Sequence, residues 1–468
     1  MKVLLINPPV QCSKGLNLGT ENRAQVPPVG LLYLGGMLEK GGHSVDLIEC
    51  SVKRYPWDNL EEEIETKRPD LIGITSTTPS FANAIKTAVT CRRIHPSIKI
   101  IFGGYHPTFF AKRILEEYPF VDIVCRGEGE FALLELCNGT PLESILGITY
   151  RAGNEVMENK ERPIEMDLDV FPFPARHLIE DYSYGEMGGL IQMANPKRFA
   201  FLITSRGCPY SCSYCCVSAF CKSTYRIRSV NNIEEEVRLL KSQGRDRIYV
   251  SDDNFTVSPN VKEICDVLKN YSIQWVCLSR ADANLSLFKY MADHGCRAIY
   301  FGVENFSQRV LDYYSKRMSV GQIKERITKA KEAGLDVAVS LIIGSPIETE
   351  EDVQENINAL NELDIDLLEL NILTFFPGTT LWKKEGLDLW DRELLVSSVH
   401  KVHSQEELER WCEQMKFAFY GRKKYILKQV FRTLTNRFDL LPINLNKVPR
   451  LYRFFRKSKS AKRNKQNE

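Results

Sequence analysis

The sequence has no uninterrupted apolar stretch near the length that a membrane-spanning helix requires. It also lacks the basic n-region and the cleavage site of a signal peptide, and we expect the N-terminal run MKVLLINPPV to form a first β-strand. Without a secretory signal, the 14 cysteines argue against a disulfide framework and for a reducing cytoplasm. Clustered thiols in that compartment indicate metal or redox chemistry.

With 468 residues, 43% of them hydrophobic and 26% charged, the chain has the composition of a globular protein with two or three domains. Its net charge of +2 is unevenly distributed. Residues 421–468 hold 15 Lys/Arg and 2 Asp/Glu, a net charge of +13, so that the preceding residues carry −11. An acidic body with a basic tail indicates that the tail takes part in an interaction.

The basic tail begins with an apolar stripe at helical spacing, which predicts a helix that ends before Pro442. The stripe consists of Leu427, Val430, Phe431, Leu434 and Phe438. One interpretation is a helix packed on the preceding domain and followed by a solvated segment. Another is peripheral attachment to an anionic membrane, since aromatic and basic side chains alternate in RLYRFFRKSKSAKRNK. Non-specific attraction to nucleic acid ranks third, because the sequence contains no RNA-binding module and we expect no specific nucleic-acid partner.

Residues 1–142 alternate short apolar β-rich runs with amphipathic helical segments, which predicts a parallel sheet covered on both faces. In open α/β sheets, ligands bind at the carboxyl ends of the strands. We therefore predict an N-terminal flavodoxin-like, Rossmann-type binding domain. The residues at the predicted strand ends include Asn7, Pro8, Ser76, Thr77, Gly103, Gly104, Gly127, Glu128 and Gly129.

Three further regions follow. Residues 143–195 contain a predicted hairpin and a proline-punctuated linker, DLDVFPFPARHL. Residues 196–385 show six β/α units, too few for a full eight-unit barrel, and they predict a partial (β/α)6 TIM-like barrel with its site at the C-terminal strand ends. Strand signals fade in residues 386–468, where we expect a helical region that carries the basic tail.

Three cysteines, Cys208, Cys212 and Cys215, form the pattern C-x3-C-x2-C after the predicted strand FAFLITS. Three thiolates on one compact loop can bind three irons of a 4Fe–4S cluster and leave the fourth iron open. The alternative is a zinc-stabilised α/β scaffold without enzymatic activity, which needs a fourth ligand. Cys221 suits that position better than Cys216, because Cys216 is adjacent to Cys215 and the two cannot easily point at one ion.

The segment RGCPYSCSYC resembles the signature of the radical S-adenosylmethionine (SAM) superfamily, C-x3-C-x-aromatic-C, with Tyr214 as the aromatic residue. The segments SDDNF, SRAD, FGVEN, LIIGSPIET and FPGTTLW extend the resemblance along the following strands to residue 382. It implies a 4Fe–4S cluster on the three cysteines that cleaves SAM to start radical chemistry. The SAM-binding residues that it implies are Tyr214, Asp252, Asp253, Ser279, Arg280, Glu304, Ile343 and Gly344.

Each of these residues has an implied role. The Tyr214 backbone would lie near the adenine, and Asp252 and Asp253 near the methionyl amino group. Arg280 suits a carboxylate, and Glu304 suits the ribose hydroxyls or the amino group. An ordinary ion pair at the barrel mouth is the alternative for Arg280 and Glu304. SDDN stands where the superfamily often has Gly-Gly-Glu, which weakens the assignment of the amino-group contact.

An α/β domain ahead of such a barrel resembles the cobalamin-dependent subgroup, whose pattern matches INPP, GGYHPT and RGEGE. The resemblance implies cobalamin as a cofactor at the strand ends listed above and at His106. The loop D-x-H-x-x-G, which supplies a cobalt-ligating histidine, is absent, and NPPVQCSKG follows the first strand. His106 is either an alternative lower ligand or, as we favour, a turn residue with local hydrogen bonds.

For the whole chain, the resemblance implies a methyltransferase that uses SAM and cobalamin and acts on an unactivated carbon of a small-molecule or lipid-like substrate. A cyclase, mutase or oxidase without net methylation is the enzymatic alternative. The resemblance also implies an electron donor such as flavodoxin or ferredoxin.

Overall fold

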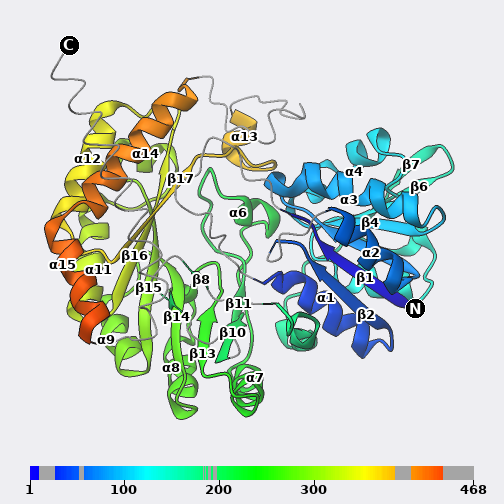
Figure 1. The fold of residues 1–468 in the computed structure, drawn as a ribbon, viewed down its shortest axis with the longest axis horizontal. Coiled ribbons are helices and arrows are strands. Elements are labelled where there is room, and N and C mark those ends of the chain that lie inside the picture. Colours follow the sequence, from blue (N-terminus) through cyan, green and yellow to red (C-terminus); the bar gives the residue numbers. More distant parts are fainter. Residues whose placement is uncertain are drawn as a thin grey trace.

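The computed structural model describes residues 1–9, 27–51, 57–182, 184, 186–187, 191–192, 198–384 and 402–435. These residues form two large sheets that stand side by side, each flanked by helices (Figure 1). The first belongs to the N-terminal third of the chain, and the second to the remainder. No helix among the described residues is long and apolar enough to cross a membrane.

The first sheet has the strand order β2-β1-β3-β4-β5-β6-β7. Its first five strands are parallel in the 2-1-3-4-5 order, which confirms the predicted flavodoxin-like fold. The hairpin of β6 and β7, which the sequence places in the linker region, extends this sheet with two antiparallel strands. The strands are β1 (Lys2–Asn7), β2 (Ser44–Glu49), β3 (Leu71–Thr75), β4 (Lys99–Gly103), β5 (Ile123–Cys125), β6 (Ile148–Ala152) and β7 (Glu155–Glu158).

Helices cover both faces of the first sheet, which explains why its strands read as continuous apolar runs. Leu4 and Ile6 of β1 belong to the core under α2, α3 and α4. Val3 and Leu5 belong to the opposite core, under α1 and α5. The helices are α1 (Val29–Lys40), α2 (Trp57–Lys67), α3 (Phe81–Ile94), α4 (Tyr105–Glu117) and α5 (Glu130–Cys137).

The second sheet contains six parallel strands in the order β10-β13-β14-β15-β16-β17, which confirms the partial (β/α)6 barrel. They are β10 (Phe199–Leu202), β13 (Arg247–Val250), β14 (Gln274–Arg280), β15 (Cys296–Glu304), β16 (Asp336–Ile343) and β17 (Leu367–Ile372). The helices around them are α7 (Val230–Ser242), α8 (Val261–Asn270), α9 (Leu285–Asp293), α10 (Gln308–Tyr313), α11 (Val320–Glu332), α12 (Glu350–Glu362) and α13 (Thr380–Lys384).

Shorter elements complete the described chain. Two small antiparallel ribbons pair β8 (Glu186–Met187) with β9 (Ile191–Gln192), and β11 (Ser205–Arg206) with β12 (Arg226–Ile227). Helix α6 (Cys216–Phe220) lies between β11 and β12 in the chain and faces the first domain (Figure 1).

The two domains share a hydrophobic core. Val29, Tyr33 and Met37 of α1 join Phe199 and Phe201 of β10 in one cluster of buried side chains. The linker adds Leu168 and Phe171 to the same cluster. Side chains of α1 and of the first barrel strand thus form part of one interface between the two domains.

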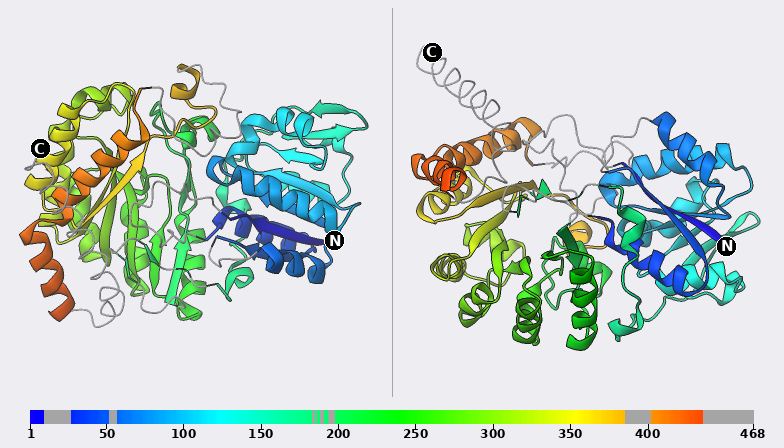
Figure 2. Two further views of the ribbon diagram at one scale, coloured as in Figure 1. Left: turned by 45° about the horizontal axis from the view of Figure 1, so that its top comes forward. Right: turned by 60° about the horizontal axis from the view of Figure 1, so that its bottom comes forward.

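The C-terminal part consists of α14 (Gln405–Tyr420) and α15 (Lys423–Thr435) on the side of the barrel away from the first domain (Figures 1 and 2). Helix α14 is firmly packed, with Trp411, Met415 and Phe419 in the barrel core. The predicted tail helix is confirmed in α15, but Leu427 and Phe431 of its stripe are 68% and 65% exposed. Phe438 and the side chains of Val430 and Leu434 lie outside the described residues.

Candidate active site

The loop of three cysteines leaves the barrel after β10 and β11 and runs into α6. Cys212 is buried, and Cys208 and Cys215 are half-buried. A backbone hydrogen bond of 3.1 Å from Cys215 N to Cys212 O closes a turn between two of the three thiols. Ser213, between them, donates its N–H to Tyr314 O, so the loop is anchored to the chain that follows α10.

Gly207 explains how the chain turns into this loop. Its φ of +84° lies in the left-handed region, and a Cβ would overlap Thr224 O. The N–H of Gly207 donates to Asp253 Oδ2 at 3.0 Å. Cys221 packs beneath Gly207 and is 7% exposed.

Asp252 follows β13 and bonds to the chain that leads into the cysteine loop. Its carboxylate is buried and accepts hydrogen bonds from the backbone N–H and the hydroxyl of both Thr204 and Ser205. With four donors already present, Asp252 holds the start of the cysteine loop and has no free acceptor for the amino group of SAM. The net effect of burial is to raise the pKa of Asp252 to about 6, and the four hydrogen bonds partly oppose this rise. Asp253 is exposed and remains the carboxylate available for that contact.

Arg280 lies directly under the cysteine loop. Its Nη1 donates to Cys212 Sγ at 3.2 Å, and its Nη2 donates to Lys316 O at 2.7 Å. Its Nε donates to Asp282 at 3.0 Å, and its guanidinium stacks 3.8 Å from the centre of the Tyr210 ring. The guanidinium is thus fixed on four sides, and one of its hydrogen bonds goes to a proposed cluster ligand.

Glu304 is buried beside a lysine that sequence reasoning missed. Lys316 is 3% exposed and places its Nζ 2.7 Å from Glu304 Oε1 and 3.3 Å from the hydroxyl of Tyr214. The two residues that flank Lys316 have positive φ angles of 52° and 54°, and Glu304 has a φ of 71°. The chain therefore bends sharply around Lys316. The segment YYSKRM contains no glycine, so the sequence does not indicate this bend.

The remaining implied SAM residues lie at the carboxyl ends of their strands. The Ser279 hydroxyl pairs with that of Thr256 and donates to Arg280 O at 2.8 Å. Ile343 is fully buried at the end of β16. Gly344 follows with a φ of +92°, and its N–H donates to Glu348 Oε2 at 2.6 Å.

The donor set of the loop suits an iron–sulfur cluster. Among the described residues, no group of three or more His, Cys, Asp or Glu side chains converges on a point where it could hold one ion. Three soft sulfur donors on one loop, with a guanidinium against one of them, suit an iron–sulfur cluster whose thiolates bind separate irons.

The strand ends of the first domain lie at one edge of its sheet. Gly104 has a φ of +97°, and a Cβ there would lie 2.7 Å from Ser76 O, so glycine lets the loops after β3 and β4 approach each other. Gly103 accepts at its O from Ser76 N at 2.9 Å. The Asn7 amide donates to Glu49 and Ser51, buried Pro8 follows it, and exposed Thr77 precedes a short 3₁₀ turn.

His106 does not lie on that edge. Its ring is fully buried, 4.1 Å from the ring of Phe81 and 4.9 Å from that of Phe110. Its Nδ1 is 3.3 Å from Thr78 Oγ1, and burial lowers its pKa to about 3. His106 thus lies in the first turn of α4, inside the first-domain core, and its hydrogen-bond partner comes from the segment after β3, so it is not the turn residue with local hydrogen bonds that we favoured. The loop that replaces D-x-H-x-x-G lies largely outside the described residues.

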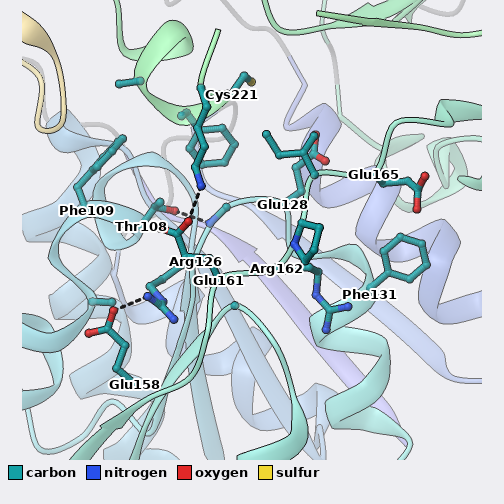
Figure 3. A pocket seen from close by; sticks show the side chains of 18 of the residues that line it. Thr108, Phe109, Arg126, Glu128, Phe131, Glu158, Glu161, Arg162, Glu165 and Cys221 are labelled. Atoms are coloured by element: carbon teal, nitrogen blue, oxygen red, sulfur yellow. Dashed lines mark hydrogen bonds and ion pairs between the residues drawn. The ribbon is translucent and has the colours of Figure 1, made fainter. Parts of the chain in front are cut away.

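A cavity of about 440 Å³ opens beside the loop after β5. Figure 3 shows Thr108 and Phe109 of α4, Glu128 and the linker residues Glu161 and Glu165 around it, with Cys221 of the barrel opposite. Gly127 lines the cavity with a φ of +74°, and a Cβ there would meet nothing within 4 Å. Gly129 follows as the N-cap of α5. The backbone at Gly127 is therefore open to a ligand in this cavity.

Glu128 points from the same loop to the barrel. Its carboxylate accepts from Arg226 at 2.7 and 2.8 Å and from Arg206 at 3.2 Å. Burial raises the pKa of Glu128, but the two arginines hold it below its ordinary value. Besides its implied role as a cobalamin contact, Glu128 forms a salt bridge between the two domains. The sequence does not reveal this bridge, because Glu128 and Arg226 lie 98 residues apart.

Known proteins share both halves of this arrangement. The family model of the B12 binding domain matches residues 18–137, and that of the radical SAM superfamily matches residues 202–360. An uncharacterized methyltransferase of Pyrococcus horikoshii is 31% identical over 450 residues, which cover 92% of this chain and 95% of that protein. The anaerobic magnesium-protoporphyrin IX monomethyl ester cyclase of Rubrivivax gelatinosus is 28% identical over 82% of this chain and 70% of its own length.

Among solved structures, the radical S-adenosylmethionine methyltransferase TsrM of Kitasatospora setae, with cobalamin and a 4Fe–4S cluster bound, shares the fold with a TM-score of 0.64. The match covers 81% of this chain and 73% of that chain at 19% identity.

Proposed function

The chain belongs to the cobalamin-dependent radical SAM enzymes, and from this premise we propose that it transfers a methyl group from SAM to an unactivated carbon of a small-molecule or lipid-like substrate. Its cofactors are a 4Fe–4S cluster, SAM and cobalamin. The observation that carries the proposal is the three-thiol loop beside the strand-end loops of a B12-binding domain. A relative named as a methyltransferase, matched over 92% of the chain, supports the choice of reaction.

When bound, the cluster supplies an electron that cleaves SAM, and cobalamin supplies a carrier for the methyl group. Cys208, Cys212 and Cys215 would hold the cluster. Exposed Asp253 would accept from the amino group of SAM, while Lys316 would hold a carboxylate or hydroxyl at the barrel mouth. The electron would come from a donor such as flavodoxin or ferredoxin.

The residues around the loop would keep water and oxygen from the reaction. Tyr214 lies 5.1 Å from Tyr314, ring centre to ring centre, and Tyr314 is fully buried. Leu381 of α13 donates its N–H to Ser213 O at 2.9 Å and so closes the loop on its other side. A dry, aromatic wall of this kind protects a reactive radical from side reactions.

The reaction class is tested with methyl-labelled SAM. The anaerobically purified enzyme, supplied with hydroxocobalamin and a reductant, is incubated with fractionated small-molecule and lipid extracts. We expect label in a product, and none with the Cys212→Ala variant. A product formed without label would overturn methyl transfer and favour a cyclase or another rearrangement, as the name of the Rubrivivax relative suggests.

We further propose that α15 attaches the enzyme to an anionic membrane. The helix contains Lys423, Lys424, Lys428 and Arg432 and no acidic residue, and Lys428 is paired with Asp364 and Asp366 of the barrel. Exposed Leu427 and Phe431 stand one turn apart on it. Apolar side chains beside cations are what a charged lipid surface binds, and residues 436–468 add further positive charge.

Co-sedimentation with vesicles tests this attachment. We expect the protein to bind vesicles that contain phosphatidylglycerol and not vesicles of phosphatidylcholine alone. Replacing both Leu427→Glu and Phe431→Glu should abolish binding. The matched control is Leu239→Glu, a change at a 42% exposed leucine on α7, which should leave binding unchanged. Equal binding by the double variant would overturn the proposal.

A further inference from the structure

Two arginines face each other across the small ribbon that carries the cysteine loop. β11 and β12 pair in antiparallel fashion with Arg206 directly opposite Arg226. The side chain of Arg226 is 1% exposed and that of Arg206 is 14% exposed. Like charges at directly opposed positions destabilise a strand pair, and burial removes the water that would screen them. The ribbon therefore needs an anion from elsewhere in the molecule.

The first domain supplies that anion. Glu128 binds both guanidinium groups, with the distances given above, and Glu130 Oε1 accepts from Arg206 Nη1 at 2.8 Å. Both glutamates come from the loop and first helical turn that follow β5. One short segment of the first domain thus neutralises both buried cations of the barrel ribbon.

The neutralised ribbon is tied closely to the cysteine loop. Arg206 directly precedes Gly207 and Cys208, and Gly207 lies at a left-handed turn where a Cβ would overlap Thr224 O. The guanidinium of Arg206 also lies 4.7 Å from the ring centre of Tyr33 and 4.5 Å from that of Phe171. Its side chain is therefore fixed by α1, by the linker and by the β5 loop together.

We propose that Glu128 is an interdomain positioning residue. As the shared counter-ion of Arg206 and Arg226, it fixes the cysteine loop of the barrel against the strand-end loop of the first domain that contains Gly127. The binding edges of the two domains are then held at one separation through a carboxylate of this chain. The inference concerns the protein alone and stands whether or not the reaction is a methylation.

Hydrogen exchange of the full-length protein tests this role. In Glu128→Gln, amides of residues 205–228 should exchange about tenfold faster, because a hydrogen-bonded charge pair has been lost. The matched control is Glu161→Gln, which removes the exposed partner of Lys222 on the same interdomain surface. That variant should exchange at the wild-type rate. Wild-type exchange in Glu128→Gln would overturn the proposal.

A charge exchange separates counter-ion pairing from a general packing defect. Glu128→Lys combined with Arg226→Glu restores one opposite-charge pair between the domains and should recover most of the protection that Glu128→Lys alone loses. If the double variant exchanges as fast as Glu128→Lys, the shared counter-ion is excluded. As a second readout, the affinity for hydroxocobalamin, followed by its visible absorbance, should fall in Glu128→Gln and not in Glu61→Gln, which removes the α2 partner of Arg93 on α3, outside the cavity lining. Equal affinities in these two variants would also contradict the proposal.

Discussion

Arg280 brings a permanent positive charge to the sulfur of Cys212. A donor to a cluster ligand stabilises the more negative, reduced state, so Arg280→Gln should lower the midpoint potential of the cluster, by roughly 60 mV for one lost charged hydrogen bond. A redox titration followed by electron paramagnetic resonance measures this shift. Arg297→Gln, at an exposed position on β15, is the control. An unchanged potential in Arg280→Gln would show that the contact has no electronic effect.

The cysteines of the loop should divide into three ligands and two bystanders. Replacing Cys208, Cys212 or Cys215 with serine should abolish cluster assembly and SAM cleavage. Replacing Cys216 or Cys221 should leave about four irons and four sulfides per chain after anaerobic reconstitution. Iron and sulfide analysis is the measurement. Loss of iron on replacing Cys221 would contradict the three-thiolate assignment.

For single residues, the sequence predicts which groups bind the cluster better than it predicts the side-chain contacts of the site. The spacing of the cysteines indicates the cluster because its ligands are local in the chain. The position of His106 inside an aromatic core and the four donors to Asp252 depend on tertiary packing, which spacing does not encode. Lys316 was missed because its burial follows from a bend without glycine.

The elements themselves were largely predictable. The parallel strands of both large sheets follow the predicted pattern, because continuous apolar runs bounded by small residues indicate strands buried on both faces. The hairpin β6–β7 was expected as a hairpin, but its pairing with β5 was not, since register across a sheet edge is not visible in one strand. The stripe of α15 predicted a helix correctly, yet its periodicity does not reveal that Leu427 and Phe431 face away from the barrel.

The turn at Gly207 offers a test at the level of the ribbon and its loop. Gly207→Ala meets two penalties: a left-handed φ, which costs about 1–2 kcal/mol, and an overlap with Thr224 O. We expect lower thermal stability and loss of iron. Gly139→Ala is the matched control, because its φ of +77° is also left-handed while a Cβ there meets nothing within 4 Å. Iron retained in Gly139→Ala and lost in Gly207→Ala would separate steric overlap from backbone strain.

For the whole molecule, the linker between the domains is held by a buried carboxylate. Glu236 of α7 is fully buried and pairs with Arg176 of the linker and Arg228 of the barrel. Arg176 also donates to Phe201 O on β10 at 2.7 Å. The position of the linker, and with it the shared core around Phe171, therefore depends on one negative charge.

Removing that charge should destabilise the protein at neutral pH. Glu236→Gln leaves two buried arginines without a counter-ion, which costs about 3–5 kcal/mol. Burial raises the pKa of Glu236, but the two arginines hold it below its ordinary value. Its stabilisation is thus fully present above the unfolded pKa and is lost as the pH falls through the folded pKa. Wild type should lose this contribution in acid, whereas Glu236→Gln should lack it already at pH 7.

Thermal unfolding at a series of pH values checks this prediction. The difference in melting temperature between wild type and Glu236→Gln should be largest near pH 7 and should shrink below about pH 4.5, where the carboxylate of the unfolded chain takes up a proton. Glu235→Gln, at the exposed neighbouring position on α7, should follow wild type throughout. Protonation removes the charge of Glu236 and with it the ion pairs to Arg176 and Arg228. A difference in melting temperature that stays constant at every pH would therefore mean that Glu236 acts through packing and not through its charge.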